Sequence, residues 1–170
     1  MWSRSRRRAG AASVGRVELV AEGRVEGIFL TETHGELPQS VERVRALPGS
    51  GLVGNRYFFA DGDAPPGSAI TLIAAEGIEA FEQETGIPFT AAESRRNVLT
   101  RGVDVNGLVG RRFYVGEVEC VGVELCEPCA HLQGMTKPGI LKGMVHRAGL
   151  NADVLREGEI AVGDAVTIEA

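Results

Sequence analysis

The chain of 170 residues has a formal net charge of −5 at pH 7, with 44% hydrophobic and 24% charged residues, values typical of a globular protein with one well-filled core. No apolar run reaches the length of about 18 residues that a membrane helix needs. The odd number of three cysteines argues against a disulfide-linked secreted scaffold and favours a reducing cytoplasm. The 23 glycines and few aromatic residues favour a strand-rich barrel or sandwich.

Arginine dominates the beginning of the chain. Residues 1–16 contain five arginines and no acidic residue, and they lack the apolar segment of a secretory signal. We expect a disordered basic tail, with an arm that binds nucleic acid as the alternative. Residues 17–170, expected to form a single domain, carry 13 basic and 23 acidic residues, a net charge of −10 that repels polyanions. No nucleic-acid or membrane partner is therefore expected, and local basic clusters need a local reason.

Apolar and β-branched residues predict two strands near the start of this domain, at 25–30 and 41–47, and we expect them to pair. Residues 48–57 follow as a glycine-rich loop, whose glycines allow positive φ or the close approach of another group. Residues 61–67 contain two glycines and two adjacent prolines, which predict a surface loop.

The middle of the chain combines short strands with one predicted helix. Residues 70–73 predict an apolar strand. Apolar residues at helical spacing then predict a helix of about three turns over 74–85, which Gly86 ends. Residues 94–100 predict a strand that brings polar groups into the sheet.

The last third begins with a predicted hairpin, in which residues 111–115 pair with 118–125 across Gly116 and Glu117 in a type II′ turn. Residues 133–147 are basic, rich in glycine and free of acidic residues, a composition suited to capping an anion site. Residues 150–168 predict a terminal meander of short strands.

Two thiols and an imidazole lie within six residues after this hairpin, in Cys126-Glu127-Pro128-Cys129-Ala130-His131. Such a group suggests sulfur or soft-metal chemistry, although a single free cysteine is more often a small buried hydrophobe. A structural zinc site would need a second Cys-x-x-Cys pair, which the sequence does not contain. A thioredoxin-like redox pair would need a surrounding βαβ pattern, which the sequence also does not show. A cysteine hydrolase or transferase would need a histidine base from His34 or His146, and His34 is expected in a surface turn.

Several separated motifs occur in order along the chain. They are Gly51-Leu52-Val53-Gly54-Asn55-Arg56-Tyr57, Ile70-Thr71-Leu72-Ile73, Arg96-Asn97-Val98, Leu108-Val109-Gly110-Arg111-Arg112-Phe113 with Val115-Gly116, Pro128-Cys129, and 158–166. Their order and spacing resemble the MOSC domain, the module at the carboxyl end of molybdenum cofactor sulfurases. The resemblance covers about Val25 to Ile168 and includes one departure, because Asn55 stands where the family more commonly has Asp. It does not include a cysteine desulfurase domain, so neither desulfurase activity nor pyridoxal phosphate is expected.

The resemblance implies a compact β-barrel-like fold that is mainly β with a few short helices. It also implies that Cys129 occupies the position of a cysteine that ligates molybdenum or carries sulfur in related proteins. A protein thiolate suits a metal that is already held by soft dithiolene sulfur. Cys126 and His131 are lesser candidates for the metal, and a packing role is the favoured alternative for Cys126.

The implied cofactor, molybdenum cofactor (molybdopterin), brings a phosphate and a polar pterin, so its pocket needs cations and hydrogen-bonding groups. Arg56 and Arg96 are the first candidates because they lie within matched motifs. Asn97 either contacts the pterin or holds a strand end, and the structural role is favoured. The remaining candidates are Arg95, Lys137, Lys142 and Arg147.

Two functions follow from the resemblance. Related proteins reduce N-hydroxylated compounds at molybdenum, so the first expectation is a molybdenum-dependent oxidoreductase with a small-molecule substrate. We expect its electrons to come from a separate electron-transfer protein, because the chain is not expected to bind a dinucleotide itself. The alternative is a non-catalytic carrier, in which Cys129 accepts a persulfide or holds the cofactor and delivers it to a molybdoenzyme.

Overall fold

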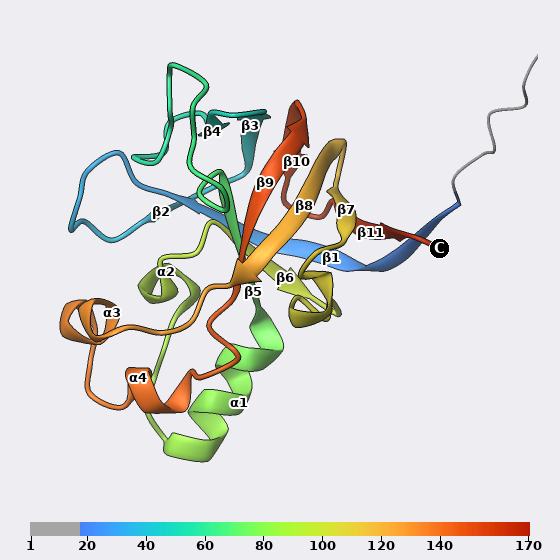
Figure 1. Cartoon of the computed structure of the whole chain (residues 1–170). Helices are drawn as coiled ribbons and strands as arrows, with labels where there is room; N and C mark the ends of the chain where they lie inside the picture. The colour runs from blue at the N-terminus through green and yellow to red at the C-terminus, as the bar shows by residue number, and fades with distance from the viewer. Residues whose placement is uncertain (1–17) are drawn as a thin grey trace, which may run out of the picture.

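A closed barrel of seven strands forms the centre of the protein, for which the computed structural model describes residues 18–170 (Figure 1). Its strands are β1 (Leu19–Leu30), β5 (Ile70–Ala74), β6 (Val98–Arg101), β7 (Arg112–Val115), β8 (Val118–Leu125), β9 (Leu150–Arg156) and β11 (Ala165–Glu169). They follow the order β11-β7-β8-β9-β5-β6-β1, and antiparallel pairing of β1 with β11 closes the ring. The barrel-like, mainly β fold implied by the resemblance is confirmed. The tail predicted over 1–16 lies outside the described residues.

Three strands form a smaller second sheet in the order β10-β3-β4. They are β3 (Arg43–Leu47), β4 (Gly51–Leu52) and β10 (Gly158–Ala161), while β2 (Gln39–Val41) pairs with β1. The expected pairing of 25–30 with 41–47 is therefore wrong beyond Val41, which pairs with Ile28. After Glu42 the chain leaves the barrel, and β3 pairs with β10 across more than a hundred residues of sequence. The pairing of β3 depends on a strand near the other end of the chain, and the sequence pattern around β3 does not identify that strand.

The neighbouring strands β5 and β6 run parallel, so the chain needs a crossover between them, and helices supply it. The crossover contains α1 (Ala75–Thr85) and α2 (Ala91–Ser94). The predicted helix over 74–85 is confirmed as α1, which ends at Gly86 in the left-handed conformation with its N–H bonded to the Glu82 carbonyl.

The strand predicted over 94–100 is wrong in its first half. Thr90 and Glu93 form a capping box, in which the Thr90 hydroxyl accepts from the Glu93 N–H at 3.2 Å and the Glu93 carboxylate accepts from the Thr90 N–H at 2.8 Å. The box starts the single turn of α2. Arg95, at φ 59°, ends the helix in the left-handed conformation, and β6 begins only at Val98.

The predicted hairpin of β7 and β8 is confirmed. Gly116 has φ 58° and Glu117 does not have positive φ, which agrees with the type II′ turn and excludes type I′. The terminal meander is not confirmed, because the last three strands have separate partners. β9 pairs with β5 and β8, β10 pairs with β3, and β11 lies between β7 and β1.

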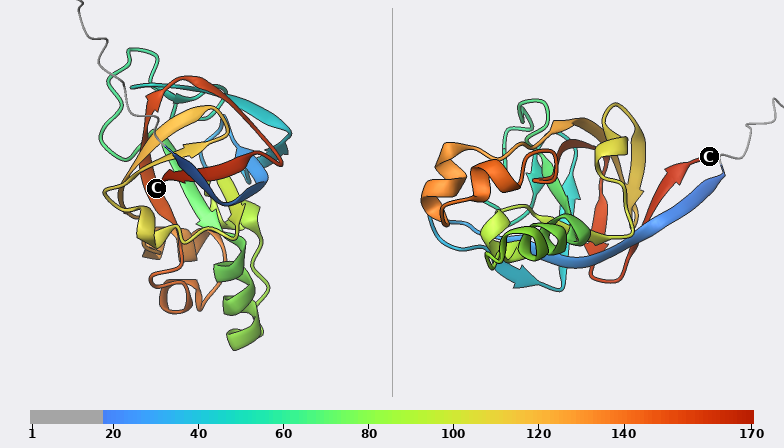
Figure 2. Two further views of the ribbon diagram at one scale, coloured as in Figure 1. Left: turned by 90° about the vertical axis from the view of Figure 1, so that its right-hand side faces the viewer. Right: turned by 90° about the horizontal axis from the view of Figure 1, so that it is seen from below.

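Two hydrophobic cores position the rest of the chain. One fills the barrel, and the other joins β5 to the helices through residues such as Ile73, Phe81, Leu132 and Met144. These helices gather at one end of the barrel (Figures 1 and 2). They include α3 (Ala130–Met135) and α4 (Ile140–Gly143), and a 3-10 turn spans Asn106–Leu108. None of the helices described in the structure has the length and apolarity needed to cross a bilayer.

Candidate functional site

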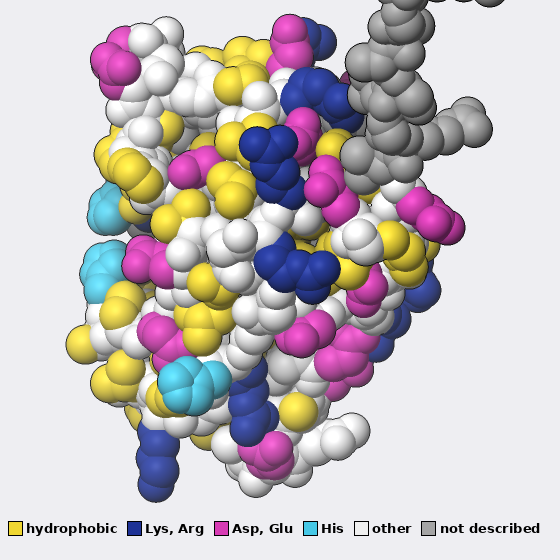
Figure 3. All heavy atoms as spheres, turned by 45° about the vertical axis from the view of Figure 1, so that its right-hand side comes forward, with side chains coloured by type: hydrophobic (Ala, Val, Ile, Leu, Met, Phe, Trp, Pro, Cys, Tyr) yellow, Lys and Arg dark blue, Asp and Glu magenta, His cyan; other side chains and the backbone are white. Residues whose placement is uncertain are grey.

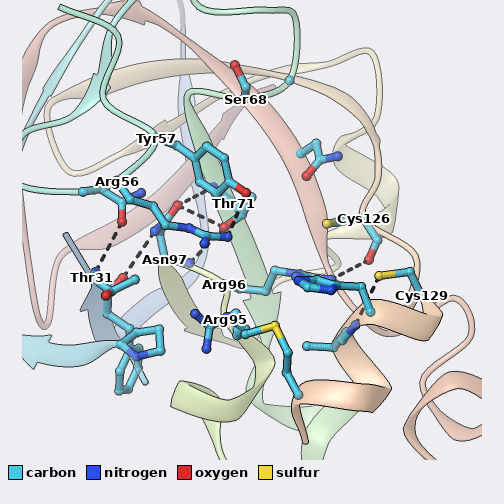
Figure 4. A pocket seen from close by; sticks show the side chains of 18 residues that line it. Thr31, Arg56, Tyr57, Ser68, Thr71, Arg95, Arg96, Asn97, Cys126 and Cys129 are labelled. Carbon is cyan, nitrogen blue, oxygen red and sulfur yellow. Dashed lines mark hydrogen bonds between the residues drawn. The ribbon is translucent and has the colours of Figure 1, made fainter. Parts of the chain in front are cut away.

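A cavity of about 330 Å³ brings together residues from distant parts of the sequence (Figure 4). Its main linings are the end of β1, the glycine loop that follows β4, β5 and the residues before it, the turn between α2 and β6, and the segment from Cys126 to Met135; Pro38 and Asn151 of β9 complete it. These segments include seven residues expected to form the site. They are Arg56, Arg95, Arg96, Asn97, Cys126, Cys129 and His131.

Cys129 presents its thiol to this cavity from the start of α3. The residue is exposed, and its Sγ accepts a hydrogen bond from the Leu132 N–H at 3.4 Å. Pro128 and Leu132 on either side are buried, so the main chain that carries the thiol is anchored in the protein. The position is both fixed and open to ligands.

The other two thiols have different surroundings. Cys126 lines the same cavity but is half-buried, and burial raises the pKa of its thiol, with the charge of Arg96 acting in the opposite direction. Cys120 is fully buried in the barrel core, where burial also raises its pKa. Within residues 18–170, no group of three or more His, Cys, Asp and Glu side chains could hold a metal ion together. Any metal at Cys129 would therefore need most of its ligands from another molecule.

Arg96 fixes the segment that carries the thiols. Its Nε donates to the Ala148 carbonyl at 2.7 Å, and its Nη2 donates to the Cys126 carbonyl at 3.2 Å. The Cys126 N–H in turn donates to the Gly149 carbonyl at 2.8 Å. Gly149 has φ 118°, and a Cβ there would lie 2.3 Å from the Leu72 carbonyl oxygen and 3.4 Å from the Arg96 Nε. Only glycine combines this positive φ with so close an approach to the Leu72 carbonyl on β5.

Arg56 and Arg95 line the cavity and contact the loop between β1 and β2. Arg56 stacks on the Tyr57 ring, with its Cζ 4.4 Å from the ring centre, and donates to the Tyr57 hydroxyl at 2.7 Å. Its second Nη contacts His34 Nδ1. Arg95 donates to the Glu36 carbonyl at 2.7 Å. Burial and the nearby charge of Arg56 both lower the pKa of Arg95.

The three lining arginines have no carboxylate partner among the described residues. Arg56, Arg95 and Arg96 bond to carbonyls, a hydroxyl and an imidazole, whereas other arginines such as Arg43 and Arg101 pair with glutamates. None of the 18 residues that line the cavity is Asp or Glu. Elsewhere, for example on the face in Figure 3, acidic and basic side chains are intermingled. The cavity therefore concentrates positive charge within an acidic protein.

Asn97 and Asn55 hold the walls of the cavity. Asn97 Oδ1 accepts from the Thr71 N–H at 3.2 Å and from the Thr71 hydroxyl at 3.0 Å, and its Nδ2 donates to the Phe29 carbonyl at 3.3 Å. These bonds link β1, β5 and the start of β6, in agreement with the structural role favoured from the sequence. Asn55 Oδ1 accepts a hydrogen bond from the Thr31 N–H at 3.4 Å. The uncharged Asn side chain therefore supplies the acceptor at the position where the family it resembles more commonly has Asp.

The other predicted basic residues lie outside the cavity lining. Lys137 bonds to Glu93 at 3.0 Å and to the Pro88 carbonyl, and Arg147 bonds to Glu84 at 2.9 Å. Lys142 is exposed on α4. The basic segment 133–147 contains the second half of α3 and all of α4, and these three side chains of the segment do not contribute to the positive charge of the cavity.

Sequence reasoning missed several residues of the site. Thr31, Tyr57 and Met135 line the cavity, and of these only Tyr57 lies in a matched motif. His34 is in an exposed turn, as expected, but its ring also stacks on that of His131, with centroids 6.0 Å apart and planes within 12°. No sequence periodicity connects these positions, because their proximity depends on loop packing.

The glycine loop also contains a spacing that is easily misread. Residues Gly49, Gly51 and Gly54 fit the Gly-x-Gly-x-x-Gly pattern of dinucleotide-binding loops. In the structure, β4 and turns occupy this segment, and no helix follows it directly. The pattern therefore does not form the strand–turn–helix unit that binds a pyrophosphate.

Comparison with protein families identifies the fold around this site. Residues 48–167 match the model of the MOSC domain. The chain belongs to the MOSC domain family. The match includes the glycine loop, both lining arginines before Asn97 and the cysteine segment, while the end of β1 precedes it. Among curated proteins, no sequence matches this MOSC chain significantly.

Solved structures agree with the family assignment at the level of fold. The YuaD protein of Bacillus subtilis superimposes with a TM-score of 0.76 at 15% identity, over 91% of this chain and 99% of its own. YiiM of Escherichia coli gives 0.64 at 17% identity, over 86% of this chain and 70% of its own. YiiM of Geobacillus stearothermophilus gives 0.61 at 17% identity, over 90% and 76%.

Proposed function

We propose that this MOSC protein binds molybdenum cofactor through the Cys129 thiolate and reduces N-hydroxylated small molecules with electrons from a separate donor protein. One observation carries the proposal. An exposed, anchored thiol and three arginines without carboxylate partners line one cavity that contains no acidic residue. A thiolate is a ligand for a soft metal, and guanidinium groups are ligands for a phosphate.

The residues of the cavity fit the chemistry of this cofactor. The volume of about 330 Å³ lies within the range of roughly 300–1,000 Å³ typical of small-molecule sites. The protein offers one exposed thiol rather than a complete set of metal ligands, which suits a metal that arrives with its own sulfur donors. The unpaired guanidinium groups suit a ligand with more than one negative charge.

Each residue has a distinct part in the proposed reaction. Arg96 holds the Cys126 carbonyl and so keeps the Cys129 segment in place, and Cys129 supplies the thiolate. Bound cofactor would supply the two electrons that reduce an N–O bond. The reaction also consumes two protons and releases water, and His131 is the titratable ring that lines the cavity beside Cys129.

The decisive experiment measures molybdenum in protein produced in a host that makes the cofactor. Wild-type protein should retain molybdenum near one atom per chain and reduce an amidoxime when given a reductant. Cys129→Ser should lose the metal while the fold persists, because a hydroxyl is a poor ligand for a soft metal at neutral pH. Cys120→Ala is the matched control, since Cys120 lies in the barrel core away from the cavity. Full molybdenum content in Cys129→Ser would overturn the proposal.

A second function is favoured by the second thiol. Cys126 and Cys129 line the same cavity. In a carrier, Cys129 would take the outer sulfur from the persulfide of a donor protein; attack of the Cys126 thiolate on the inner sulfur of the Cys129 persulfide would then form a Cys126–Cys129 disulfide and release the outer sulfur as sulfide for a molybdoenzyme. Cyanide-releasable sulfur, together with an absence of turnover, would select this carrier function over the reductase.

A further inference from the structure

A contact between two histidine rings joins two segments that line the cavity. The ring of His34, in the loop between β1 and β2, stacks on the ring of His131 in α3, with centroids 6.0 Å apart and planes within 12°. Aromatic pairs prefer centroid separations of roughly 4.5–7 Å. Both histidines are exposed, and His131 lines the cavity whereas His34 does not. The ring pair therefore lies at the rim of the cavity.

The half of this contact that comes from α3 is firmly held. His131 lies two residues after Cys129, and its neighbour Leu132 is buried in the second hydrophobic core. The Leu132 N–H also donates to Cys129 Sγ at 3.4 Å. The His131 ring is therefore fixed in place next to the thiol that it accompanies.

The other half comes from a segment with little packing of its own. Residues 32–37, which we call the flap, are all exposed, and none of them belongs to either hydrophobic core. The two ends of the flap are anchored, because the Thr31 N–H donates to Asn55 Oδ1 at 3.4 Å and Pro38 is buried. A segment with few buried contacts between two fixed ends opens at low cost in free energy.

Two arginines hold the flap with its ring in position. Arg56 contacts His34 Nδ1, and because a guanidinium group can only donate, this nitrogen accepts and the proton of a neutral His34 ring lies on Nε2. Arg95 donates to the Glu36 carbonyl at 2.7 Å. In Figures 1 and 2 the loop that contains the flap and α3 lie on the same side of the barrel. The flap is thus placed to close against α3.

We propose that His34 and His131 form a gate at the rim of the cavity, which limits by size the molecules that reach the Cys129 thiol. Small molecules pass the stacked rings, and larger ones enter only after the flap swings away and the rings separate. The gate does not depend on the proposed function, because a substrate of the reductase and a sulfur donor of the carrier must both reach this thiol.

The test compares two reagents that share one reacting group and differ in size, N-ethylmaleimide and N-(1-pyrenyl)maleimide. Their rates of reaction with Cys129 are measured on cofactor-free protein near neutral pH, with peptide mapping to assign the label, and each rate is divided by the rate with glutathione. The measured quantity is the ratio of the two normalised rates, pyrenyl over ethyl. A change in the reactivity of the thiolate alters both rates equally and cancels in this ratio, whereas a gate slows the larger reagent alone.

His34→Ala should raise the ratio by about three- to ten-fold, because a single exposed aromatic contact is weak. His34→Phe should keep the ratio of the wild type, since it retains a ring and loses only the contact with Arg56. Glu32→Ala is the matched control, because Glu32 is exposed in the same flap and takes no part in the ring contact.

Three results would overturn the gate. The first is a wild-type ratio in His34→Ala. The second is a ratio in His34→Phe as high as in His34→Ala, because the ring contact would then not be what closes the rim. The third is an equal rise in Glu32→Ala, because loss of any side chain of the flap would then suffice. The molybdenum content of Cys129→Ser remains the separate test of the proposed function.

Discussion

Replacing Asn97 with alanine tests whether this residue holds the barrel wall or contacts a ligand. Asn97 is buried, and its side chain makes three hydrogen bonds, to the Thr71 N–H, the Thr71 hydroxyl and the Phe29 carbonyl. In Asn97→Ala the hydroxyl can rotate to another acceptor, but the Thr71 N–H and the Phe29 carbonyl lose a partner inside the protein. Each such loss costs about 1–3 kcal/mol, so we expect the two losses to cost about 2–6 kcal/mol together.

This loss is a large part of the stability of a typical domain, about 5–15 kcal/mol. Urea denaturation followed by circular dichroism should show a lower midpoint with an unchanged slope, and the melting temperature should fall by about 4–24 °C. Thr71→Val is the matched variant, because it removes the hydroxyl and keeps the backbone N–H. The two substitutions should couple by more than about 0.5 kcal/mol, since the residues share hydrogen bonds. Near-native stability of Asn97→Ala with a ten-fold loss of anion affinity would refute the structural role.

Three further predictions concern other parts of the chain. Iodoacetamide at about pH 7.5 should modify exposed Cys129 but not Cys120 in folded protein, because burial raises the Cys120 pKa and keeps its thiol protonated; peptide mapping that finds native Cys120 alkylated would contradict this. Gly149→Ala should destabilise the fold by about 3 kcal/mol or more, owing to φ 118° and the steric clash described above, and a melting curve like that of wild type would refute this. Burial would raise the pKa of Glu93, but its capping and lysine bonds outweigh burial and lower the pKa. Glu93→Gln should therefore cost about 1 kcal/mol at pH 7, and this difference should vanish as the pH falls through the lowered pKa; a pH-independent difference would refute the linkage.

Local chemistry made parts of this fold predictable. Helix α1 was predicted because its apolar spacing and Gly86 agree, and the hairpin of β7 and β8 was predicted because Gly116 specifies the turn. Short α2 was missed, since a helix of one turn has no apolar period and ends at Arg95, a residue type that rarely adopts positive φ. The chain's departure from the barrel at Glu42 was missed because the partner of β3 is β10, near the other end of the sequence.

The site residues that were predicted correctly are those that lie in short segments with a recognisable sequence pattern of their own. Cys129 and the two motif arginines were found because each lies in a short segment with its own pattern, and all three line the cavity. Lys137, Lys142 and Arg147 were chosen from composition alone, and composition does not reveal that Lys137 pairs with a glutamate on α2 and Arg147 with one on α1. The approach of His34 to Arg56 depends on packing between separate loops.

The arrangement of arginines implies a conflict between the stability of the free protein and its capacity to bind. Arg56, Arg95 and Arg96 are partly buried without counter-ions, and Arg95 also adopts a left-handed conformation that costs about 1 kcal/mol or more in a residue with a side chain. Because an anion that binds only the folded state stabilises it, a ligand at a hundred-fold excess over its Kd should contribute about 2.7 kcal/mol. Inorganic phosphate should therefore raise the melting temperature more than chloride of equal ionic strength. The same increase in an Arg56→Met, Arg95→Met double variant would show that the stabilising anion binds beside Arg96 or outside the cavity.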